Sequence, residues 1–347
     1  MEYESGLADL PGDRSATTGT AHSTPDRNLG LELVRVTEAA ALAAARVMGR
    51  GDQRTAEEAA VHGMRLMMDT LPTDGLIVVG EGEKRRAAML YHGEAIGRGQ
   101  GLAVDIAVNA IDGRRLAAKG MNGALSAAAL AERGSMFDPG PCRYMDKIAV
   151  GEEAANVIDI SAPVAENLRR IAAARHSRTS DLTVAILDRD RHEQLVKEVL
   201  EAGARVKIII AGEIGGAISA ARAGTGVDVL LGVGGTAEGV VAACAIKCLG
   251  GAIQGRIVLP TDAEREEAVA AGYDPNRVLT TDDLVSGDDV FFAATGITDG
   301  NLLYGVRYEG DTALTQSIAM RSRSGTVRTI NGEHRREKLK RFSSIEY

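Results

Sequence analysis

The first periodic pattern along the chain is helical. Apolar residues recur at spacings of three and four between Leu29 and Ala44, which predicts a helix that Asn28 can cap. A glycine-rich stretch at residues 49–52 ends this helix. A second helix is predicted from about residue 55 to residue 68, with Glu57 in its first turn, where the helix dipole favours acidic side chains.

Two short β-branched runs follow, and each of them leads into an acidic loop. Residues 76–79 and 103–108 have the composition of strands that deliver polar side chains to a loop. The loops read Gly80-Glu81-Gly82-Glu83 and Asn109-Ala110-Ile111-Asp112-Gly113-Arg114. Carboxylate oxygens are preferred ligands of hard divalent cations, so two such loops can converge on one metal site.

The second half of the chain alternates between helical and strand patterns. Helices are predicted near residues 164–174, 192–202, 214–221 and 237–249, with strands at 182–187, 206–210, 227–231 and 290–294 and a β-meander at 306–330. Strands separated by helices of this length imply parallel crossovers. We therefore predict an α/β fold of two coupled lobes. Residues 1–27 form a disordered tail, 28–155 the N-terminal lobe with the acidic loops, and 156–347 the C-terminal α/β lobe with the substrate contacts.

Composition and charge narrow the possible partners. Aromatic residues make up only 3% of the 347 residues and the net charge is −8, which argues against nucleic-acid binding. No apolar run reaches membrane length, so no membrane partner is expected. Three cysteines without a disulfide pattern, and no apolar segment of a signal peptide in residues 1–28, predict a cytoplasmic protein.

Two further features point to a phosphorylated substrate. A glycine-rich turn at residues 232–239 joins a strand to a helix and leaves backbone N–H groups free for a phosphate, although its spacing matches neither a dinucleotide fingerprint nor a P-loop. Arg189 and Arg191 stand at a strand end and can clamp a phosphate in bidentate fashion. With the acidic loops, they indicate a small phosphorylated substrate and a Mg²⁺ or Mn²⁺ cofactor.

These features belong to a longer series of ordered motifs. The series includes Gly49-Arg50-Gly51-Asp52, Val79-Gly80-Glu81-Gly82-Glu83, Tyr144-Met145-Asp146-Lys147, Gly234-Gly235-Thr236-Ala237-Glu238-Gly239 and Met320-Arg321-Ser322-Arg323-Ser324-Gly325-Thr326. On these motifs the chain, from about residue 26 to residue 347, resembles a class II fructose-1,6-bisphosphatase of the bacterial type. The resemblance implies the layered αβαβα sandwich of the lithium-sensitive, metal-dependent sugar phosphatases. It also implies hydrolysis of a sugar (bis)phosphate monoester and assembly as a homodimer or homotetramer.

The resemblance also implies roles for individual residues. The implied metal ligands are Glu57, Glu81, Asn109, Asp112 and Glu238; the implied substrate contacts are Tyr144, Arg189, Arg191, Glu213 and Gly235; and the implied catalytic residues are Glu81, Asp112 and Arg114. Several positions depart from the family. The family loop normally reads Asp-Pro-Ile-Asp/Glu-Gly-Thr, so Asn109 replaces the Asp that bridges two metals and Arg114 replaces the Thr that orients the attacking water. Glu213 ends a loop that reads Asp-Gly-Asp in the family and Ala-Gly-Glu here.

These substitutions leave three hypotheses open. Two Mg²⁺ ions about 4 Å apart repel by roughly 17 kcal/mol at an effective dielectric constant of about 20, so a metal pair needs several carboxylates around it. Asn109 and Arg114 make the loop more positive, which favours a weak, single or lost metal. The chain is then a metal-dependent sugar-phosphate phosphatase, a metal-free isomerase or epimerase in which Arg114 supplies the missing charge, or a non-catalytic sugar-phosphate-binding homologue.

Overall fold

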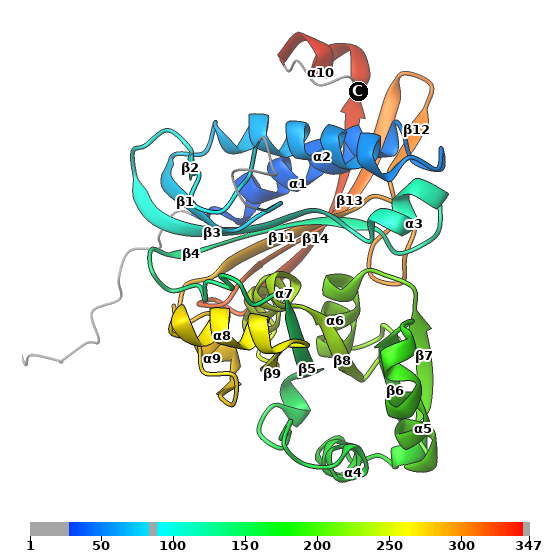
Figure 1. Ribbon diagram of the computed structural model, residues 1–347. Coiled ribbons are helices and arrows are strands. Elements are labelled where there is room, and N and C mark those ends of the chain that lie inside the picture. Colours follow the sequence, from blue (N-terminus) through cyan, green and yellow to red (C-terminus); the bar gives the residue numbers. More distant parts are fainter. Residues whose placement is uncertain (1–27, 83–88, 343–347) are drawn as a thin grey trace, which may run out of the picture.

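Two mixed β-sheets form the framework of the protein, which we describe from a computed structural model that covers residues 28–82 and 89–342 (Figure 1). The predicted tail at residues 1–27 and Glu83 of the first acidic loop lie outside these residues. The eight-stranded sheet has the order β12-β13-β11-β4-β3-β1-β2, with β14 also paired to β13, and the six-stranded sheet has the order β10-β9-β5-β8-β6-β7.

The strands of the larger sheet are β1 (Thr73–Val79), β2 (Ala95–Ile96), β3 (Leu102–Asp112), β4 (Leu125–Glu132), β11 (Phe291–Gly296), β12 (Arg307–Glu309), β13 (Thr312–Arg321) and β14 (Thr326–Arg335). Those of the smaller sheet are β5 (Tyr144–Val150), β6 (Thr183–Leu187), β7 (Arg205–Ile209), β8 (Val229–Gly235), β9 (Ala252–Val258) and β10 (Val278–Leu279). Strand β6 runs parallel to β7 and β8, as predicted, whereas β5 is antiparallel to β8 and β9.

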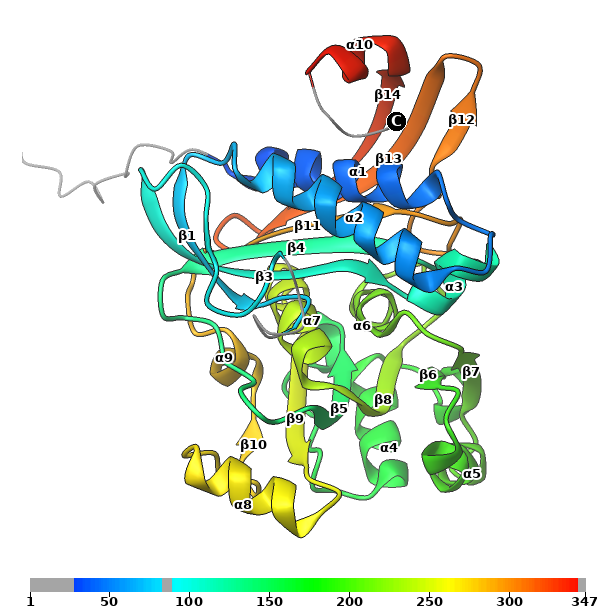
Figure 2. The same ribbon diagram turned by 45° about the horizontal axis from the view of Figure 1, so that its top comes forward.

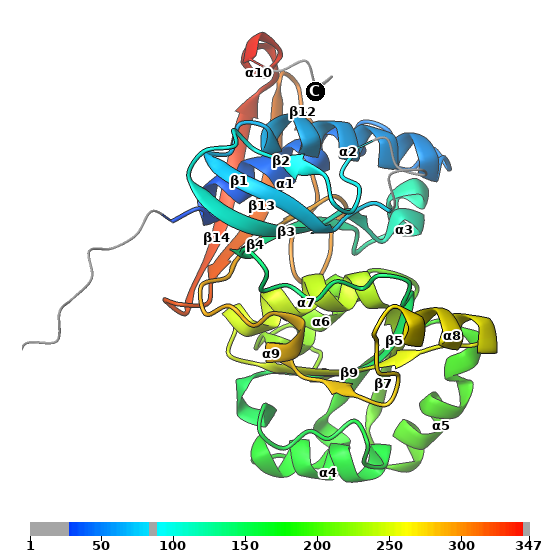
Figure 3. The ribbon, with the colours of Figure 1, turned by 60° about the vertical axis from the view of Figure 1, so that its left-hand side comes forward.

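Helices lie outside and between the two sheets. Helices α1 (Gly30–Ala45) and α2 (Gln53–Met68) cover the outer face of the larger sheet (Figure 2). Helices α6 (Glu213–Ala221) and α7 (Thr236–Cys248) lie between the sheets, and α4 (Val164–Ala174) and α5 (Glu193–Glu201) cover the far face of the smaller sheet (Figure 3). The shorter helices are α3 (Arg114–Lys119), α8 (Asp262–Ala270), α9 (Thr281–Leu284) and α10 (Arg336–Phe342). This order of layers confirms the predicted αβαβα sandwich.

The sequence of each helix fits its layer. Helix α7 is rich in Ala and Cys and is buried along nearly all of its length, because small side chains allow both sheets to approach it closely. Helices α4 and α5 are strongly amphipathic, since only one face of each meets the smaller sheet. Helix α2 begins after its cap Asp52, two residues before the predicted start, so Glu57 lies in the second turn rather than the first.

The two sheets divide the chain differently from the expected boundary between residues 155 and 156. Strands β11 to β14, which were expected in the C-terminal lobe, pair instead with the larger sheet through the β11–β4 ladder. Both β4 and β11 are alanine-rich and almost fully buried, and such strands do not reveal their partners from the order of the sequence. In the parts of the chain that the structure describes, no helix is long and apolar enough to cross a membrane.

Candidate active site

The two acidic loops meet at one edge of the larger sheet. Strands β1 and β3 are parallel neighbours, so Glu81, just after β1, and Asp112, at the end of β3, emerge at the same edge. The β3–β4 pairing contains one extra residue between Asn109 and Asp112. Ala107 faces α7, and without this bulge Asp112, five residues further on, would face the opposite side of the sheet. The bulge therefore turns the Asp112 carboxylate toward α6.

Backbone amides hold both carboxylates in place. The Glu81 Oε1 atom accepts a hydrogen bond from the Ala110 N–H at 2.6 Å, and the Asp112 Oδ2 atom accepts one from the Gly215 N–H in α6 at 2.9 Å. Burial raises the pKa of Glu81, and it raises the pKa of Asp112 to about 7. Asp112 thus exchanges a proton near neutral pH, which suits general acid or base work.

A buried ion pair supports the site from the side of the smaller sheet. The Lys147 Nζ atom lies 2.5 Å from Glu213 Oε1 and donates to the Gly235 carbonyl oxygen at 2.6 Å. The other Glu213 oxygen accepts a hydrogen bond from the Gly235 N–H at 3.2 Å. Burial raises the pKa of Glu213, while the Lys147 charge acts in the opposite direction. At Gly235 a Cβ atom would lie 1.8 Å from a Glu238 carboxylate oxygen, so a larger residue there would displace the Glu238 side chain.

Glu238, in the first turn of α7, joins these two groups of residues. Its negative charge raises the pKa of Glu81, Asp112 and Glu213, after the larger effect of burial on each. The interaction between two charges weakens as the distance between them grows, so groups whose pKa values respond to one another lie close together. The predicted acidic residues from both sheets therefore share one region.

Arg114 brings positive charge into this region. Its Nη1 atom lies 2.6 Å from Glu57 Oε1. Burial alone would lower the pKa of Arg114, but the charges of Glu57, Glu81 and Glu238 raise it above its usual value. Glu57 thus pairs with a cation from another helix and is not a cap.

Three of the predicted substrate contacts lie together. Tyr144 is the register partner of Gly235 in the β5–β8 ladder, and the Arg191 guanidinium lies over the Tyr144 ring, 5.8 Å from its centroid. An Nη atom of Arg191 donates to the Val233 carbonyl oxygen at 2.7 Å. Arg189 donates instead to the Ile210 carbonyl oxygen at 3.0 Å, in the loop that leads to Glu213. The basic and aromatic residues thus border the glycine-rich turn.

Comparison with known proteins identifies the family of this chain. Residues 27–334 match the family described as "Bacterial fructose-1,6-bisphosphatase, glpX-encoded". The chain belongs to this bacterial fructose-1,6-bisphosphatase family. A relative from Synechococcus sp. (strain JA-2-3B'a(2-13)), named D-fructose 1,6-bisphosphatase class 2/sedoheptulose 1,7-bisphosphatase, is 41% identical over 337 residues, which cover 90% of this chain and 97% of the relative. The fructose-1,6-bisphosphatase class 2 of Haemophilus influenzae (strain ATCC 51907 / DSM 11121 / KW20 / Rd) is 40% identical over 92% of this chain and all of the relative.

Membership in the fructose-1,6-bisphosphatase family confirms the resemblance that the motifs predicted. It makes the chain a phosphoric monoester hydrolase of the sugar-phosphate class. It does not favour the metal-free isomerase or the non-catalytic homologue. The altered loop at Asn109 and Arg114 is therefore a variation within a family of phosphatases.

The fructose-1,6-bisphosphatase family is metal-dependent, but the resting side chains here do not form a closed metal centre. In the part of the chain that the structure describes, no three carboxylate, imidazole or thiolate groups are arranged to hold a metal ion. The oxygens of Glu81 and Asp112 face backbone N–H groups, and those of Glu57 and Glu213 face Arg114 and Lys147. The predicted ligand set of Glu57, Glu81, Asn109, Asp112 and Glu238 stays a prediction.

Lys147 is the site residue that sequence reasoning missed. It shares one face of β5 with Met145 and Ala149, which both pack in the apolar core against α6 and α7. A lysine on the inward face of an otherwise apolar strand is rarely buried without a partner. The position of Lys147 between apolar residues on one face of the strand could have predicted that the lysine is buried and paired. It does not say which acid is the partner.

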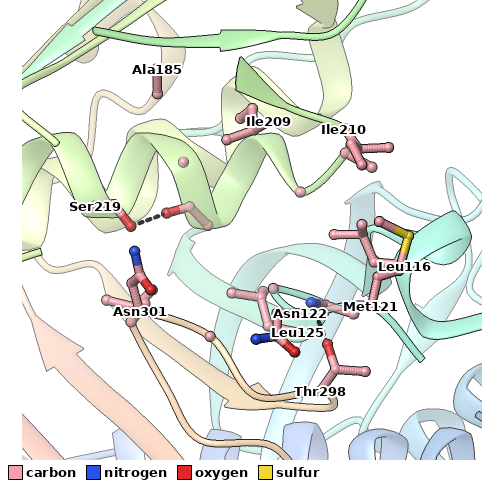
Figure 4. Close-up of a pocket in the computed structure, with 18 of the residues that line it drawn as sticks. Leu116, Met121, Asn122, Leu125, Ala185, Ile209, Ile210, Ser219, Thr298 and Asn301 are labelled. Atoms are coloured by element: carbon pink, nitrogen blue, oxygen red, sulfur yellow. Dashed lines mark hydrogen bonds between the residues drawn. The ribbon is translucent and has the colours of Figure 1, made fainter. Parts of the chain in front are cut away.

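A cavity of about 340 Å³ lies beside the start of α6 (Figure 4). Its lining is mostly apolar, with Leu116, Met121, Leu125, Ile209 and Ile210 among the side chains drawn in Figure 4. The acidic side chains of the site do not line it. Polar side chains also line the cavity, Lys207, Ser219 and Thr298 among them. We propose the active site at the acidic edge, because the carboxylates that a divalent cation prefers lie there.

Proposed function

We propose that this chain hydrolyses the C1 phosphoester of a sugar bisphosphate. Fructose 1,6-bisphosphate and sedoheptulose 1,7-bisphosphate are the first candidates, because both stand in the name of the Synechococcus relative. The observation that carries the proposal is the shared site. Electrostatic coupling through Glu238 joins Glu81 and Asp112 to Glu213, which is bonded to Gly235 beside Tyr144 and Arg191.

The basic side of the site suits the substrate. Arg191 is exposed and can exchange its carbonyl partner Val233 for a phosphate oxygen, which offers a charge-assisted bond in return. Arg189 can make the same exchange at Ile210. The exposed ring of Tyr144 offers an apolar surface for the sugar, and Glu213 can accept a hydrogen bond from a sugar hydroxyl.

The acidic side suits the reaction. A water molecule attacks phosphorus, the bond from phosphorus to the sugar oxygen breaks, and the sugar oxygen takes up a proton. Glu81 and Asp112 are placed to orient the water and accept its proton, and Asp112 titrates near neutral pH. Arg114 provides positive charge where negative charge develops on the phosphoryl oxygens. These roles for Glu81, Asp112 and Arg114 are part of the proposal.

The finer cofactor assignment belongs to the same proposal. We assign Mg²⁺ or Mn²⁺, because the available donors are carboxylate oxygens of Glu81, Asp112 and Glu238 and the amide oxygen of Asn109, which are the donor types that these hard ions prefer. The ion would bind weakly, since Arg114 already supplies charge to Glu57.

The assembly and the cellular location of the protein are also part of the proposal. We propose a homodimer or homotetramer, in line with the family resemblance. We propose the cytoplasm because the three cysteines are free and buried, as a reducing compartment favours.

The test is phosphate release from sugar mono- and bisphosphates by the full chain and by Glu81→Gln. We expect Glu81→Gln to lower kcat about 10²- to 10⁴-fold, because it loses the carboxylate that orients the water. Glu58→Gln is the matched control, since Glu58 is exposed and pairs with Arg54 on the surface of α2. Full turnover in Glu81→Gln, or no phosphate release from any bisphosphate by the parent chain, would contradict the proposal.

A further inference from the structure

Arg114 lies at the border of the acidic region, where two helices adjoin. Arg114 is the first residue of α3, and Gly113 before it adopts a left-handed conformation (φ 88°) that turns the chain from β3 into the helix. Glu57 projects from α2, which packs against α3. The 2.6 Å contact between their side chains therefore joins two rigid elements.

The guanidinium stands where several negative charges overlap. Besides Glu57, the carboxylates of Glu81 and Glu238 act on Arg114, and neither belongs to a neighbouring stretch of sequence. The other two acids of the region have partners elsewhere: Asp112 binds the Gly215 N–H and Glu213 binds Lys147. Arg114 thus contacts Glu57 directly, and the charges of Glu81 and Glu238 act on it from nearby.

A divalent ion among these three carboxylates would meet the same guanidinium. A metal ion and an arginine that share carboxylates repel each other, and they compete for the same oxygen atoms. Glu57 already turns its carboxylate toward Arg114. The family pattern has an uncharged threonine at this position.

We propose that Arg114 is a built-in cation that competes with a divalent ion for the acidic region, so that the chain binds one divalent ion fewer, or binds the same ions more weakly, than it would with an uncharged residue there. The inference rests on the proposed function for the location of the site. It concerns the number and affinity of bound ions and not the rate of the reaction.

The experiment measures Mn²⁺ binding by the full chain, from the electron paramagnetic resonance signal of free Mn²⁺. The variant is Arg114→Thr, which installs the residue of the family pattern. We expect Arg114→Thr to bind one more Mn²⁺ ion per chain than the parent, or to bind the same number at least tenfold more tightly. Arg114→Lys keeps the charge and should resemble the parent. Arg115→Thr, an exposed neighbour on α3, is the matched control for loss of a surface charge.

Equal stoichiometry and affinity in the parent, Arg114→Thr and Arg114→Lys would overturn the inference, and so would a gain that Arg115→Thr shows equally. Urea unfolding of each variant confirms that the compared proteins are folded. A failure of this inference can be distinguished from a failure of the proposed function. A Mn²⁺ gain in a chain that releases no phosphate would refute only the function, and phosphate release without a Mn²⁺ gain would refute only the role of Arg114.

Discussion

Two ion pairs stand at opposite sides of the active site, and their geometry is almost the same. Arg114 and Glu57 approach to 2.6 Å, and Lys147 and Glu213 approach to 2.5 Å. Their surroundings differ: 47% and 27% of the Arg114 and Glu57 side chains are exposed, against 1% and 9% for Lys147 and Glu213. The distance alone therefore does not determine the strength of an ion pair, because water screens the Arg114–Glu57 pair and is excluded from the Lys147–Glu213 pair.

The difference in solvent gives the two pairs different tasks. Lys147 has two oxygen partners, Glu213 and the Gly235 carbonyl, and loses both if it moves. It therefore fixes α6 and the glycine-rich turn relative to each other. Arg114 can leave Glu57 at small cost, because water can solvate both groups. A fixed pair thus supports the proposed substrate side, and an exchangeable pair stands at the proposed catalytic side.

The largest expected effect tests this contrast in stability. Lys147→Met should lower the free energy of unfolding by about 3–5 kcal/mol, since it leaves the buried Glu213 carboxylate without its cation. Arg114→Met should cost less than about 1 kcal/mol, as an exposed pair does. Urea unfolding of both variants measures the two losses.

The double variant Lys147→Met with Glu213→Leu is the control for this comparison. It removes both buried charges and should recover part of the stability that Lys147→Met loses. Similar losses in Lys147→Met and Arg114→Met would show that burial does not distinguish the two pairs.

The contrast also shows what the sequence could predict. The helices at residues 164–174 and 237–249 were predicted to within a residue or two, because the first has a strong apolar periodicity and the second is a long alanine-rich run. The layered fold and the family followed from ordered motifs. The bulge at Asn109–Asp112 was not predicted, because an extra residue in a strand is visible only once its partner β4 is known.

The site contacts that sequence reasoning missed are long-range. Arg114 and its partner Glu57 are 57 residues apart in the sequence, and Lys147 and its partner Glu213 are 66 residues apart. Each of these residues has several acids or bases at a comparable distance along the chain. Only the packing of α2 on α3, and of α6 beside β5, selects the partner. The residue types of the site were therefore predictable, but its pairings were not.

A smaller effect is expected on the substrate side. Arg191→Lys keeps the charge but loses the planar guanidinium that lies over Tyr144 and can bind two phosphate oxygens. We expect KM to rise about tenfold, which corresponds to about 1.4 kcal/mol, with kcat little changed. Steady-state kinetics with the preferred bisphosphate measures both values. Arg169→Lys, on the exposed face of α4, is the control. An unchanged KM would remove Arg191 from the substrate site.

The smallest expected effect is a pH dependence of stability that comes from His192, the residue after Arg191. His192 is buried: its Nε2 atom accepts a hydrogen bond from the Val233 N–H at 2.9 Å, so its Nδ1–H donates to the Leu187 carbonyl oxygen at 2.8 Å. Protonation of Nε2 would break the bond to Val233, whose carbonyl oxygen holds Arg191. The neutral imidazole is therefore part of the folded site.

Burial lowers the pKa of His192, and the charges of Arg191 and Arg189 lower it further, while the Leu187 hydrogen bond and the Asp146 charge oppose this. Because the folded pKa lies below the unfolded value of about 6.5, the unfolded chain binds the proton more readily. The stability contribution is thus present above about pH 6.5 and is lost as the pH falls through the folded pKa.

Urea unfolding between about pH 7.5 and 5.5 should therefore show a steeper loss of unfolding free energy in the parent than in His192→Gln, which has no titrating group at position 192. His62→Gln, at an exposed position, should keep the parent's slope. Equal slopes in the parent and His192→Gln would mean that His192 does not couple folding to pH.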